Sequence, residues 1–421
     1  MAASPADGLW NRRTLLQVGA AGAGIAAVTR ATGAAAVSAP GSLVPQSDFP
    51  GVQGLTYLNA AQKHPLNIHV AQAWKDFADF NLRVPDAAGP PYLGMDQAVL
   101  AKFAKLIHAD PVEVGFVPST MSAENLIVAA LGLPGHGGNV VTDSLHYDGS
   151  VYLYQQLAAR GLDVRRIEQR DGRIPIEEMH KAIDGNTVLV SVSLVSYANG
   201  FHHDLKPVCD AAHAHGALVY ADIIQAAGAI PVDVRDSNVD MCAASGHKWM
   251  MGDHGLGFLY VRKDLIDGGR LHPTQFGWKQ VERDGFRIFR DHPKNGDPVD
   301  YHIRPGTVGR FEVGTYALGP MVCLNASLDY IAGIGVAAIR DHASSLAAQL
   351  RAELPRHGYE CLSPPDAAGH ISAFRIADMD AARRKLEKAN IRVRLTQDFM
   401  RVSVSVFNSG RDIDALISAL A

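Results

Sequence analysis

The sequence contains little cysteine, and none of it stands in a recognisable pattern. Of 421 residues only four are cysteines, and no two form a CxxC pair or share the Cys/His spacing of a zinc site. We therefore predict no metal site and expect core packing for all four: Cys209, Cys242, Cys323 and Cys361.

Basic runs are absent as well. The chain has 39 Lys and Arg against 43 Asp and Glu, a formal net charge of −4, and no cluster of cations that could follow a phosphate backbone. Nucleic acid is therefore excluded as an expected partner. A hydrophobic content of 47% in a chain of this length is enough for a large core or two packed domains.

A long, strongly apolar run is also missing, which argues against stable membrane insertion. The stretch after Arg12 and Arg13 is Ala/Gly-rich and only weakly apolar, and a small-residue region, "GAAAVSA", follows it. This order is typical of a twin-arginine export signal. We predict that residues 1–40 are signal peptide and leader, read by the twin-arginine export machinery, and that the mature protein is periplasmic or secreted. The alternative is a disordered tail with a chance Arg-Arg pair.

From residue 113 onward, short β-rich runs alternate with helical stretches. This alternation predicts an α/β fold whose seven-stranded, mostly parallel sheet carries helices on both faces. The seven expected strands are "EVGFV", "NVVTD", "LDVRRI", "TVLVSVS", "ALVYAD", "VDMCAA" and "LGFLYVR". We assign residues 41–310 to this large domain.

Two further segments follow the expected sheet. Residues 264–309 are rich in Gly, Pro, His and Arg, and they predict a long functional loop region near a site. Residues 311–421 are expected to form a smaller α/β domain with a helix over 320–353, strands at "HISAFRI" and "RVSVSV", and a terminal helix.

Polar residues stand directly after two of the expected strands. "ALVYA" runs into Asp222, and "VDMCAA" runs into Ser245, His247 and Lys248. In an open parallel sheet the carboxyl ends of the strands form the ligand site. Asp222 and Lys248 could simply pair as a salt bridge. Alternatively, Lys248 forms a Schiff base with pyridoxal phosphate (PLP), and Asp222 keeps the pyridine nitrogen protonated.

Two other strand ends fit a PLP site. "FVPSTMSAENL" places Ser119 and Thr120 at the start of a helix, where backbone N–H groups could bind a phosphate, although an ordinary N-cap has the same sequence. "DSLHYDG" offers His146, whose flat ring could stack on a pyridine, although a core or surface histidine is the simpler interpretation.

The block "SYANGFHHDLKPVCDAAHAHGALVYADIIQAAGAIPVDV…VDMCAASGHKWMMGDHGLGFLYVRK" resembles the central block of the class V aminotransferase-fold enzymes. These belong to PLP fold type I and include cysteine desulfurases, isopenicillin N epimerase-like enzymes, kynureninases and C–S lyases. The similarity extends from about Leu58 to the C-terminus. It implies a PLP-dependent transferase fold type I, with PLP as the cofactor.

The resemblance also assigns roles by position. It implies that Lys248 carries the cofactor and acts as a catalytic group with Asp222 and His146, that Asp222 contacts the pyridine nitrogen, and that His146 covers the ring. Gln225 and Asn199 are placed near the phenolic oxygen. The full cofactor set is Lys248, Asp222, Gln225, Asn199, His146, Thr120, Met121, Ser245, His247 and Thr315.

The remaining members of that set surround the phosphate. Thr120, Ser245 and His247 are expected there, while Met121 departs from the Gly-Thr-Thr that the family often has at this loop. "RFEVGT" resembles the segment whose Gly-Thr, here ending in Thr315, reaches the phosphate of a neighbouring subunit, which implies a homodimer.

"MRVSVSVFNS" is similar to the family's closing motif, in which an arginine, here Arg401, binds the α-carboxylate of the substrate. The planar fork of a guanidinium suits a carboxylate. The desulfurases carry a nucleophilic cysteine before this motif, but "NIRVRLTQDFM" has none. Persulfide-forming desulfuration is therefore disfavoured.

These residues predict an exported PLP enzyme acting at the α-carbon of an amino acid, by amino-group transfer, epimerisation or β-elimination. The alternative is a catalytically idle member of the family with a binding or regulatory role, against which the intact set of site residues argues. The arginines of the 264–309 segment, with Trp278, hint at an acidic substrate group, or else form a solvated surface: Arg283, Arg287 and Arg304.

Overall fold

The computed structural model describes residues 41–84, 92–281, 302–396 and 398–421. The leader 1–40, with Arg12 and Arg13, lies outside these residues, as do Arg283 and Arg287. The predicted export signal therefore stays a prediction.

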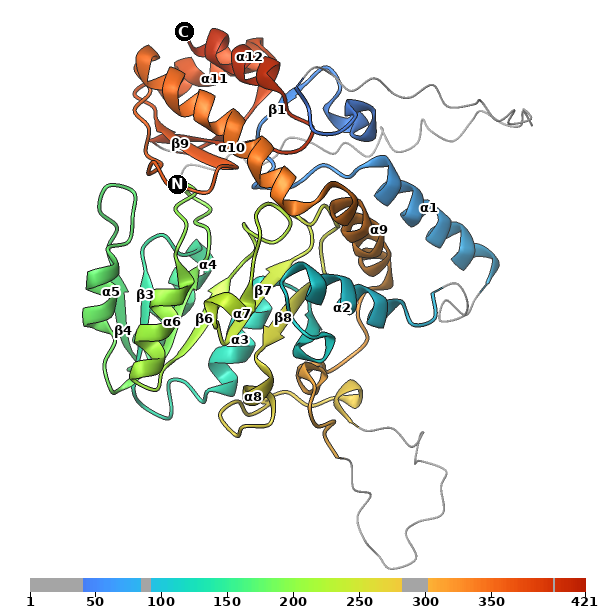
Figure 1. The fold of residues 1–421 in the computed structure, drawn as a ribbon, viewed down its shortest axis with the longest axis vertical. Helices are drawn as coiled ribbons and strands as arrows, with labels where there is room; N and C mark the ends of the chain where they lie inside the picture. Colours follow the sequence, from blue (N-terminus) through green and yellow to red (C-terminus); the bar gives the residue numbers. More distant parts are fainter. Residues whose placement is uncertain (1–40, 85–91, 282–301, 397) are drawn as a thin grey trace, which may run out of the picture. The chain divides into compact units, whose positions relative to one another are not determined.

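A seven-stranded sheet forms the centre of the large domain (Figure 1). Its order is β2-β8-β7-β6-β5-β3-β4, and β8 alone among these seven strands runs antiparallel to its neighbours. The α/β fold with a mostly parallel sheet is thus confirmed. The strands are β2 (Val114–Val117), β3 (Asn139–Asp143), β4 (Asp163–Ile167), β5 (Thr187–Ser193), β6 (Leu218–Asp222), β7 (Met241–Ser245) and β8 (Gly257–Val261).

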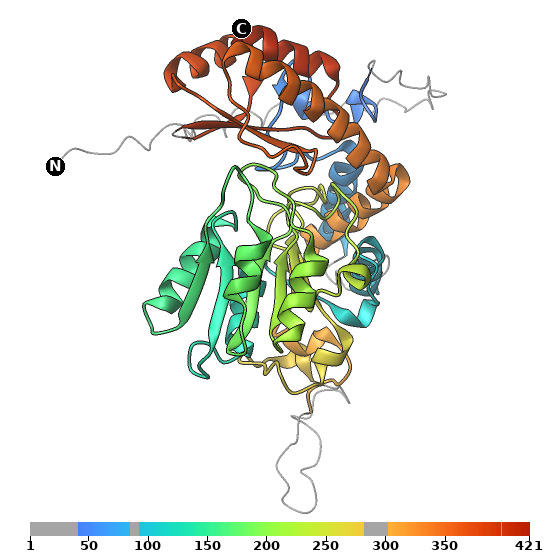
Figure 2. The same cartoon turned by 60° about the vertical axis from the view of Figure 1, so that its left-hand side comes forward.

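Continuous burial explains the composition of β2, β3, β6, β7 and β8, whereas β4 at the edge of the sheet is only partly buried. In β6 the side chains of Leu218 and Tyr220 enter one hydrophobic cluster, while Val219 and Ala221 enter the cluster on the opposite face. Figure 2 shows helices on both faces of the sheet. The first face carries α3 (Thr120–Ala130), α4 (Asp148–Ala158) and α8 (Lys263–Ile266), and the second carries α5 (Ile176–Ala182), α6 (Leu205–Ala214) and α7 (Val234–Ser237).

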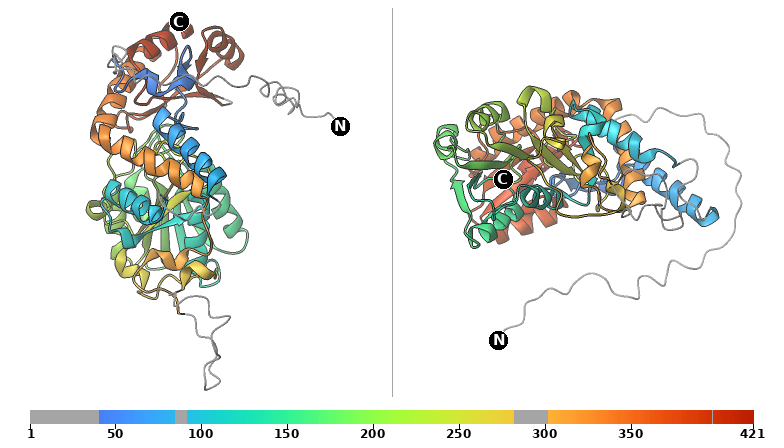
Figure 3. Two further views of the ribbon diagram at one scale, coloured as in Figure 1. Left: turned by 90° about the vertical axis from the view of Figure 1, so that its right-hand side faces the viewer. Right: turned by 90° about the horizontal axis from the view of Figure 1, so that it is seen from below.

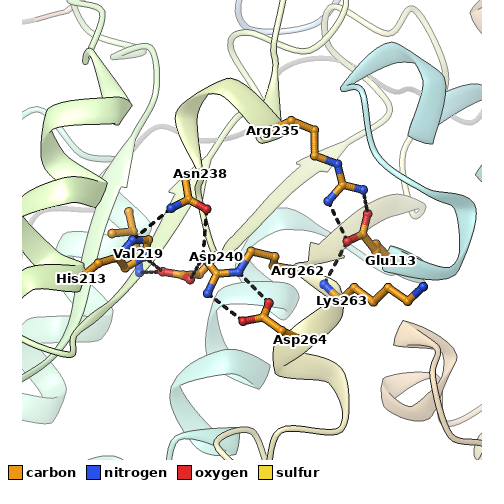
Figure 4. A network of polar contacts seen from close by, with 9 residues as sticks. All are labelled: Glu113, His213, Val219, Arg235, Asn238, Asp240, Arg262, Lys263 and Asp264. Atoms are coloured by element: carbon orange, nitrogen blue, oxygen red, sulfur yellow. Dashed lines mark hydrogen bonds and ion pairs between the residues drawn. The ribbon is translucent and has the colours of Figure 1, made fainter.

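Two buried carboxylates fasten the end of the sheet where the parallel strands begin (Figure 4). Asp240 accepts a hydrogen bond from the Val219 amide at 2.7 Å and lies 2.8 Å from His213 and 2.9 Å from Arg262. Glu113 pairs with Arg235 and accepts the Lys263 amide at 2.9 Å. Structural ion pairs therefore occupy this end, and the opposite, carboxyl end is where a ligand site is expected.

The antiparallel direction of β8 determines where the chain enters the 264–309 segment, whose predicted role near a site stays a prediction. Gly257 pairs with Ser245, and Val261 pairs with Met241, so the chain leaves β8 at the end of the sheet opposite Lys248. The described parts of the 264–309 segment pack there, with Leu271 and Val308 in the cluster on the α3 and α4 face. Gln275 of the same segment lines a pocket with Met121 and Ser122 at the start of α3.

The helix predicted over 320–353 is two helices. α9 (Leu318–Ile334) ends at Gly335, and α10 (Val336–Glu353) continues at an angle of 74° (Figure 3). Gly335 has φ +89°, a conformation that side chains other than glycine rarely adopt. In the described part of the chain, no single helix meets the length and hydropathy of a membrane span, and α9 and the α10 region do so only together, across this bend.

The two helices contribute mainly to different cores. α9 packs against α1 (Ile68–Arg83) and α2 (Met95–Leu106), and its Leu324 and Leu328 join the large core. The α10 residues Ala343 and Leu346 join the core of the C-terminal unit. Ile339 of α10 still joins the large core, so the core changes between Ile339 and Ala343. The boundary predicted at residue 311 stays a prediction.

The C-terminal unit contains an antiparallel sheet of order β11-β12-β9. Its further elements are β9 (Ile371–Arg375), α11 (Met379–Lys388), β10 (Ile391–Arg392), β11 (Arg394–Leu395), β12 (Phe399–Ser403) and α12 (Gly410–Leu420). The start of the described chain completes this unit. β1 (Thr56–Tyr57) pairs with β10, the Leu43 amide bonds the Val406 carbonyl at 3.0 Å, and Leu58 is fully buried in its core.

Candidate active site

Asp222 and Lys248 follow neighbouring parallel strands and face the same end of the sheet. Asp222 closes β6 and is 2% exposed, and its Oδ1 accepts the Ile224 amide at 2.8 Å. Lys248 lies in the turn after β7, with Nζ 6.0 Å from the centre of the Tyr147 ring. No ion pair within 4.0 Å joins the two or engages either with another described residue. The salt-bridge interpretation therefore does not hold.

Burial affects the pKa values of Lys248 and Asp222 more strongly than the two side chains affect each other. Burial lowers the pKa of Lys248 to about 8, although Asp222 opposes the shift. Burial raises the pKa of Asp222 to about 6, against the effects of His146 and the Ile224 amide. An amine with a pKa near 8 is in part neutral at physiological pH, which is the state that attacks an aldehyde.

Glycines shape the turn that carries Lys248. A Cβ at Gly246 or Gly252 would lie 2.8 Å from the Leu324 side chain of α9. The turn "SGHKWMMG" is therefore pressed against α9, and a larger residue at either glycine would displace the lysine.

Thr120 and Ser245 form a reciprocal pair at the N-terminus of α3. The Thr120 amide donates to Ser245 Oγ at 2.9 Å, and the Ser245 amide donates to Thr120 Oγ1 at 3.0 Å. His247 is half-buried and stacks on His254 at 4.2 Å between ring centres. Burial, then His254, Lys248 and Lys63, lower the pKa of His247 to about 4. A helix N-terminus beside these cations suits an anion such as a phosphate.

Met121 and Thr315 lie at the edge of this region. Met121 Sδ is 3.6 Å from Ser150 Oγ, so its side chain packs between α3 and α4. Thr315 is exposed, next to Tyr316, whose hydroxyl donates to the Phe116 carbonyl of β2 at 2.7 Å. The roles predicted for both stay predictions.

His146 is enclosed by protein rather than open to a ligand. Its side chain is 0% exposed, Nδ1 lies 2.8 Å from Ser193 Oγ, and Nε2 lies 3.2 Å from Glu124 Oε1. A ring whose face was kept for a cofactor would be open to the cavity. The prediction that His146 covers the pyridine ring is therefore not supported, because Glu124 and two serines draw the imidazole into the layer between sheet and helices.

Tyr147 presents its ring to the site instead. It is 38% exposed, lies beside Lys248, and meets the Tyr197 ring edge-on at 5.6 Å and 81°. Neither Tyr147 nor Tyr197 is among the site residues that the sequence predicts. The available signal was the adjacency of an aromatic residue to His146 in "LHYDG".

The Glu124 and His146 pair should contribute to stability in a pH-dependent way. Burial alone would lower the pKa of His146, but the nearby Glu124 carboxylate raises it. Burial alone would raise the pKa of Glu124, but His146 and the hydrogen bonds from Ser150 and Ser191 lower it. The histidine's contribution is present below its unfolded pKa and is lost as pH rises through the raised folded value. The carboxylate's contribution is present above its unfolded pKa and is lost as pH falls through the lowered folded value.

Replacing Glu124 with glutamine should therefore lower the free energy of unfolding by about 1–3 kcal/mol near pH 6, because a buried donor loses its charged acceptor. Urea unfolding between pH 4 and 9 measures this. The matched control is Glu353→Gln, which removes an exposed pair with Arg356 and should cost under about 1 kcal/mol. Equal losses in the two variants, or a loss independent of pH, would contradict the prediction.

Asn199 does not reach the site. Its Nδ2 donates to the Gly172 carbonyl at 2.8 Å, and its Oδ1 accepts the Phe201 amide at 3.0 Å. Its amide is thus fixed by backbone groups, and the prediction of a contact with the phenolic oxygen is corrected. The neighbouring Tyr197 contacts the Tyr147 ring, and its carbonyl accepts a hydrogen bond from Arg401.

Gln225 is 2% exposed and bonded on both sides. Its Oε1 accepts from Trp249 Nε1 at 2.7 Å, and its Nε2 donates to the Ala61 carbonyl at 3.2 Å. One N–H of the amide remains for a ligand oxygen.

Arg401 is a buried cation without a carboxylate partner in the described chain. It is 5% exposed, Nη1 donates to the Tyr197 carbonyl at 2.9 Å, and Nε has no hydrogen-bond partner. Burial, followed by Arg394, lowers the pKa of Arg401 to about 10. A pairing with Asp398, the structural alternative, is not observed among the described ion pairs. A buried guanidinium in this state is suited to an anionic ligand.

The residues present fit PLP. Lys248 is an amine without an ion-pair partner, Asp222 is a buried carboxylate one strand away, and the N-terminus of α3 is where an anion could bind. Together they match an aldehyde, a pyridine nitrogen and a phosphate. No group of three His, Cys, Asp or Glu suited to a metal occurs in the described ranges.

Residues 95–416 match the family model described as "Aminotransferase class-V". The chain belongs to the class-V aminotransferase family. It is 30% identical over 342 residues to a probable cysteine desulfurase of Methanothermobacter thermautotrophicus, covering 79% of this chain and 81% of that protein. It is 27% identical over 401 residues to isopenicillin N epimerase of Amycolatopsis lactamdurans, covering 87% and 94%.

Solved structures share the fold. A C-DES mutant with glycine covalently linked to its PLP cofactor superposes with a TM-score of 0.75 at 22% identity, covering 89% of this chain and 98% of that one. The PLP-dependent transferase fold type I expected from the sequence is confirmed.

Proposed function

We propose that this class-V enzyme is exported and acts at the α-carbon of an amino acid by amino-group transfer, epimerisation or elimination. The chain is a PLP-dependent class-V enzyme with an amino-acid substrate, and the proposal concerns the finer reaction. The observation that carries it is the pair of unpaired groups at one end of the sheet, Lys248 and Arg401. The Lys248 amine suits a carbonyl group, and the Arg401 guanidinium suits a carboxylate.

Bound PLP supplies an electron sink for the charge left at the α-carbon when one of its bonds breaks. Arg401 orients the substrate by its α-carboxylate, which fixes the bond to be broken. Lys248, with its lowered pKa, accepts the α-proton at Nζ and can return it. Asp222, at the end of β6, places a negative charge where the pyridine nitrogen is expected. The Tyr147 ring lies beside Lys248 and limits the access of water to the amine.

Persulfide chemistry is disfavoured even though several relatives are named cysteine desulfurases. Cys209, Cys242 and Cys323 are buried, and burial raises the pKa of each thiol. Cys361 is half-buried on an isolated bridge to Phe374, with Sγ 3.5 Å from the Ser363 carbonyl. A nucleophilic cysteine needs the opposite, an exposed thiol with a lowered pKa.

A product screen tests the reaction. The holoenzyme is incubated with a panel of amino acids, with and without a keto acid, and the mixtures are analysed for keto acids, inverted enantiomers and elimination products. If no amino acid changes the cofactor absorbance or gives a product, the protein is a catalytically idle binder. The exposed Thr315 supports our further proposal of a homodimer in which this segment reaches the partner's phosphate site.

Export is proposed from the leader sequence, and it predicts that Arg12→Lys with Arg13→Lys leaves folded enzyme inside the cell. Fractionation followed by immunoblotting measures the distribution. Lys75→Arg, an exposed change in α1, is the control and should leave export unchanged. Normal periplasmic amounts of the double variant would make the leader an incidental tail.

A further inference from the structure

Two arginines face each other across the strand pair that carries the predicted carboxylate-binding residue. Arg394 of β11 and Arg401 of β12 are direct cross-strand partners. Like charges at paired positions of an antiparallel sheet destabilise it. No ion pair in the described chain offsets this repulsion.

Both side chains point away from the C-terminal core. Their strand neighbours Leu395 and Met400 are also partners, and these two pack into that core. Because successive residues alternate between the faces of a sheet, Arg394 and Arg401 share the other face, on which Arg401 contacts Tyr197. Arg394 therefore stands on the substrate side of the sheet.

Arg394 also lines a cavity of about 230 Å³ between α11 and β10. We call this cavity the arginine groove and define it by Gln62, Arg383, Glu387, Arg392 and Arg394. It holds three arginines and one glutamate. None of the three arginine side chains forms a hydrogen bond or ion pair with the described residues, whereas Arg356 and Arg375 elsewhere in this unit pair with glutamates.

A polar path connects the groove with Arg401. Arg401 Nη2 donates to Asn59 Oδ1 at 3.4 Å, and Asn59 Nδ2 donates to Gln62 Oε1 at 2.9 Å. A ligand held at Arg401 can thus extend toward Arg394 over side chains that donate and accept hydrogen bonds.

We propose that the arginine groove binds a second anionic group of the substrate, so that the enzyme prefers amino acids whose side chain carries a carboxylate. The proposal rests on the proposed function, because it places the α-carboxylate at Arg401. A dicarboxylate lying between Arg401 and Arg394 would offset the repulsion of the cross-strand pair. Arg392 and Arg383 supply the outer wall and exclude substrates with cationic side chains.

L-glutamate and L-glutamine test this, since they differ in charge but hardly in size. The holoenzyme is titrated with each while the cofactor absorbance is followed. The wild type should bind glutamate about tenfold more tightly, a ratio that falls as salt is raised because Arg394 is exposed. Arg394→Ala should reduce that preference about fivefold by weakening glutamate binding alone, and Arg394→Lys should restore part of it.

Arg356→Ala is the matched control, an exposed arginine of the same unit, and should keep the full preference. Equal binding of the two amino acids by the wild type, or an undiminished preference in Arg394→Ala, overturns the groove while leaving the proposed function intact. If neither these two nor any amino acid of the panel alters the absorbance, the proposed function itself fails, and the groove falls with it.

Discussion

Lys248→Ala is expected to lose all covalent attachment of the cofactor, together with all turnover. Lys248 is the lysine that stands after a buried strand with a carboxylate at the neighbouring strand end, and its pKa is lowered to about 8. Borohydride reduction of the holoenzyme, followed by peptide mass analysis, should find the cofactor on the peptide containing Lys248 and nowhere in the variant.

Lys63→Ala is the control for that experiment, because Lys63 is exposed and close enough to His247 to affect its pKa. This variant should keep the reducible link. Attachment to a different lysine in Lys248→Ala would show that the assignment is wrong, whereas loss of the link in both variants would indicate general damage to the site.

Arg401→Ala should lower kcat/KM by about a hundredfold, while the affinity for the cofactor is kept. The change removes a buried, bidentate contact to the substrate carboxylate, of a kind worth about 2–5 kcal/mol when one partner is truncated. The loss should appear with an amino acid and be small with the amine that lacks its carboxylate.

The structural alternative predicts a different pattern. If Arg401 mainly supported the fold through Tyr197 and Asn59, the variant would unfold at lower temperature and keep its preference for the amino acid over the amine. Thermal unfolding of the apoenzyme therefore accompanies the kinetics. A wild type that does not prefer the carboxylate-bearing compound would also exclude the assigned role.

The sheet and the pair at its carboxyl end could be predicted from the sequence because both depend on local patterns. β6 and β7 are short runs of buried residues, and Asp222 ends the first run while Lys248 follows the second. Helices α9 and α10 could not be separated in this way, since the apolar pattern continues across Gly335 and only the backbone angle ends the helix.

The direction in which a site side chain points could not be predicted from the sequence. His146 and Tyr147 are adjacent, and which of them faces the site depends on Glu124, which comes from α3 and pairs with the histidine. The same holds for Asn199, whose amide is taken by the carbonyl of Gly172. The end of the sheet at which the chain leaves β8 depends on the antiparallel direction of that strand, which has no signature in composition.

The docking of β1 onto β10 has a consequence for the order in which the protein matures. Residues 41–58 are synthesised before the rest of the described chain, but the backbone partners of Leu43 and Thr56, Val406 and Asn390, are synthesised near its end. Residues 41–58 can therefore form their native backbone hydrogen bonds only when translation is nearly complete. The leader 1–40 directly precedes this segment. The leader is therefore joined to an unpaired strand until the C-terminal residues have been synthesised. If the proposed export is correct, the segment next to the leader is ordered only in a completed chain.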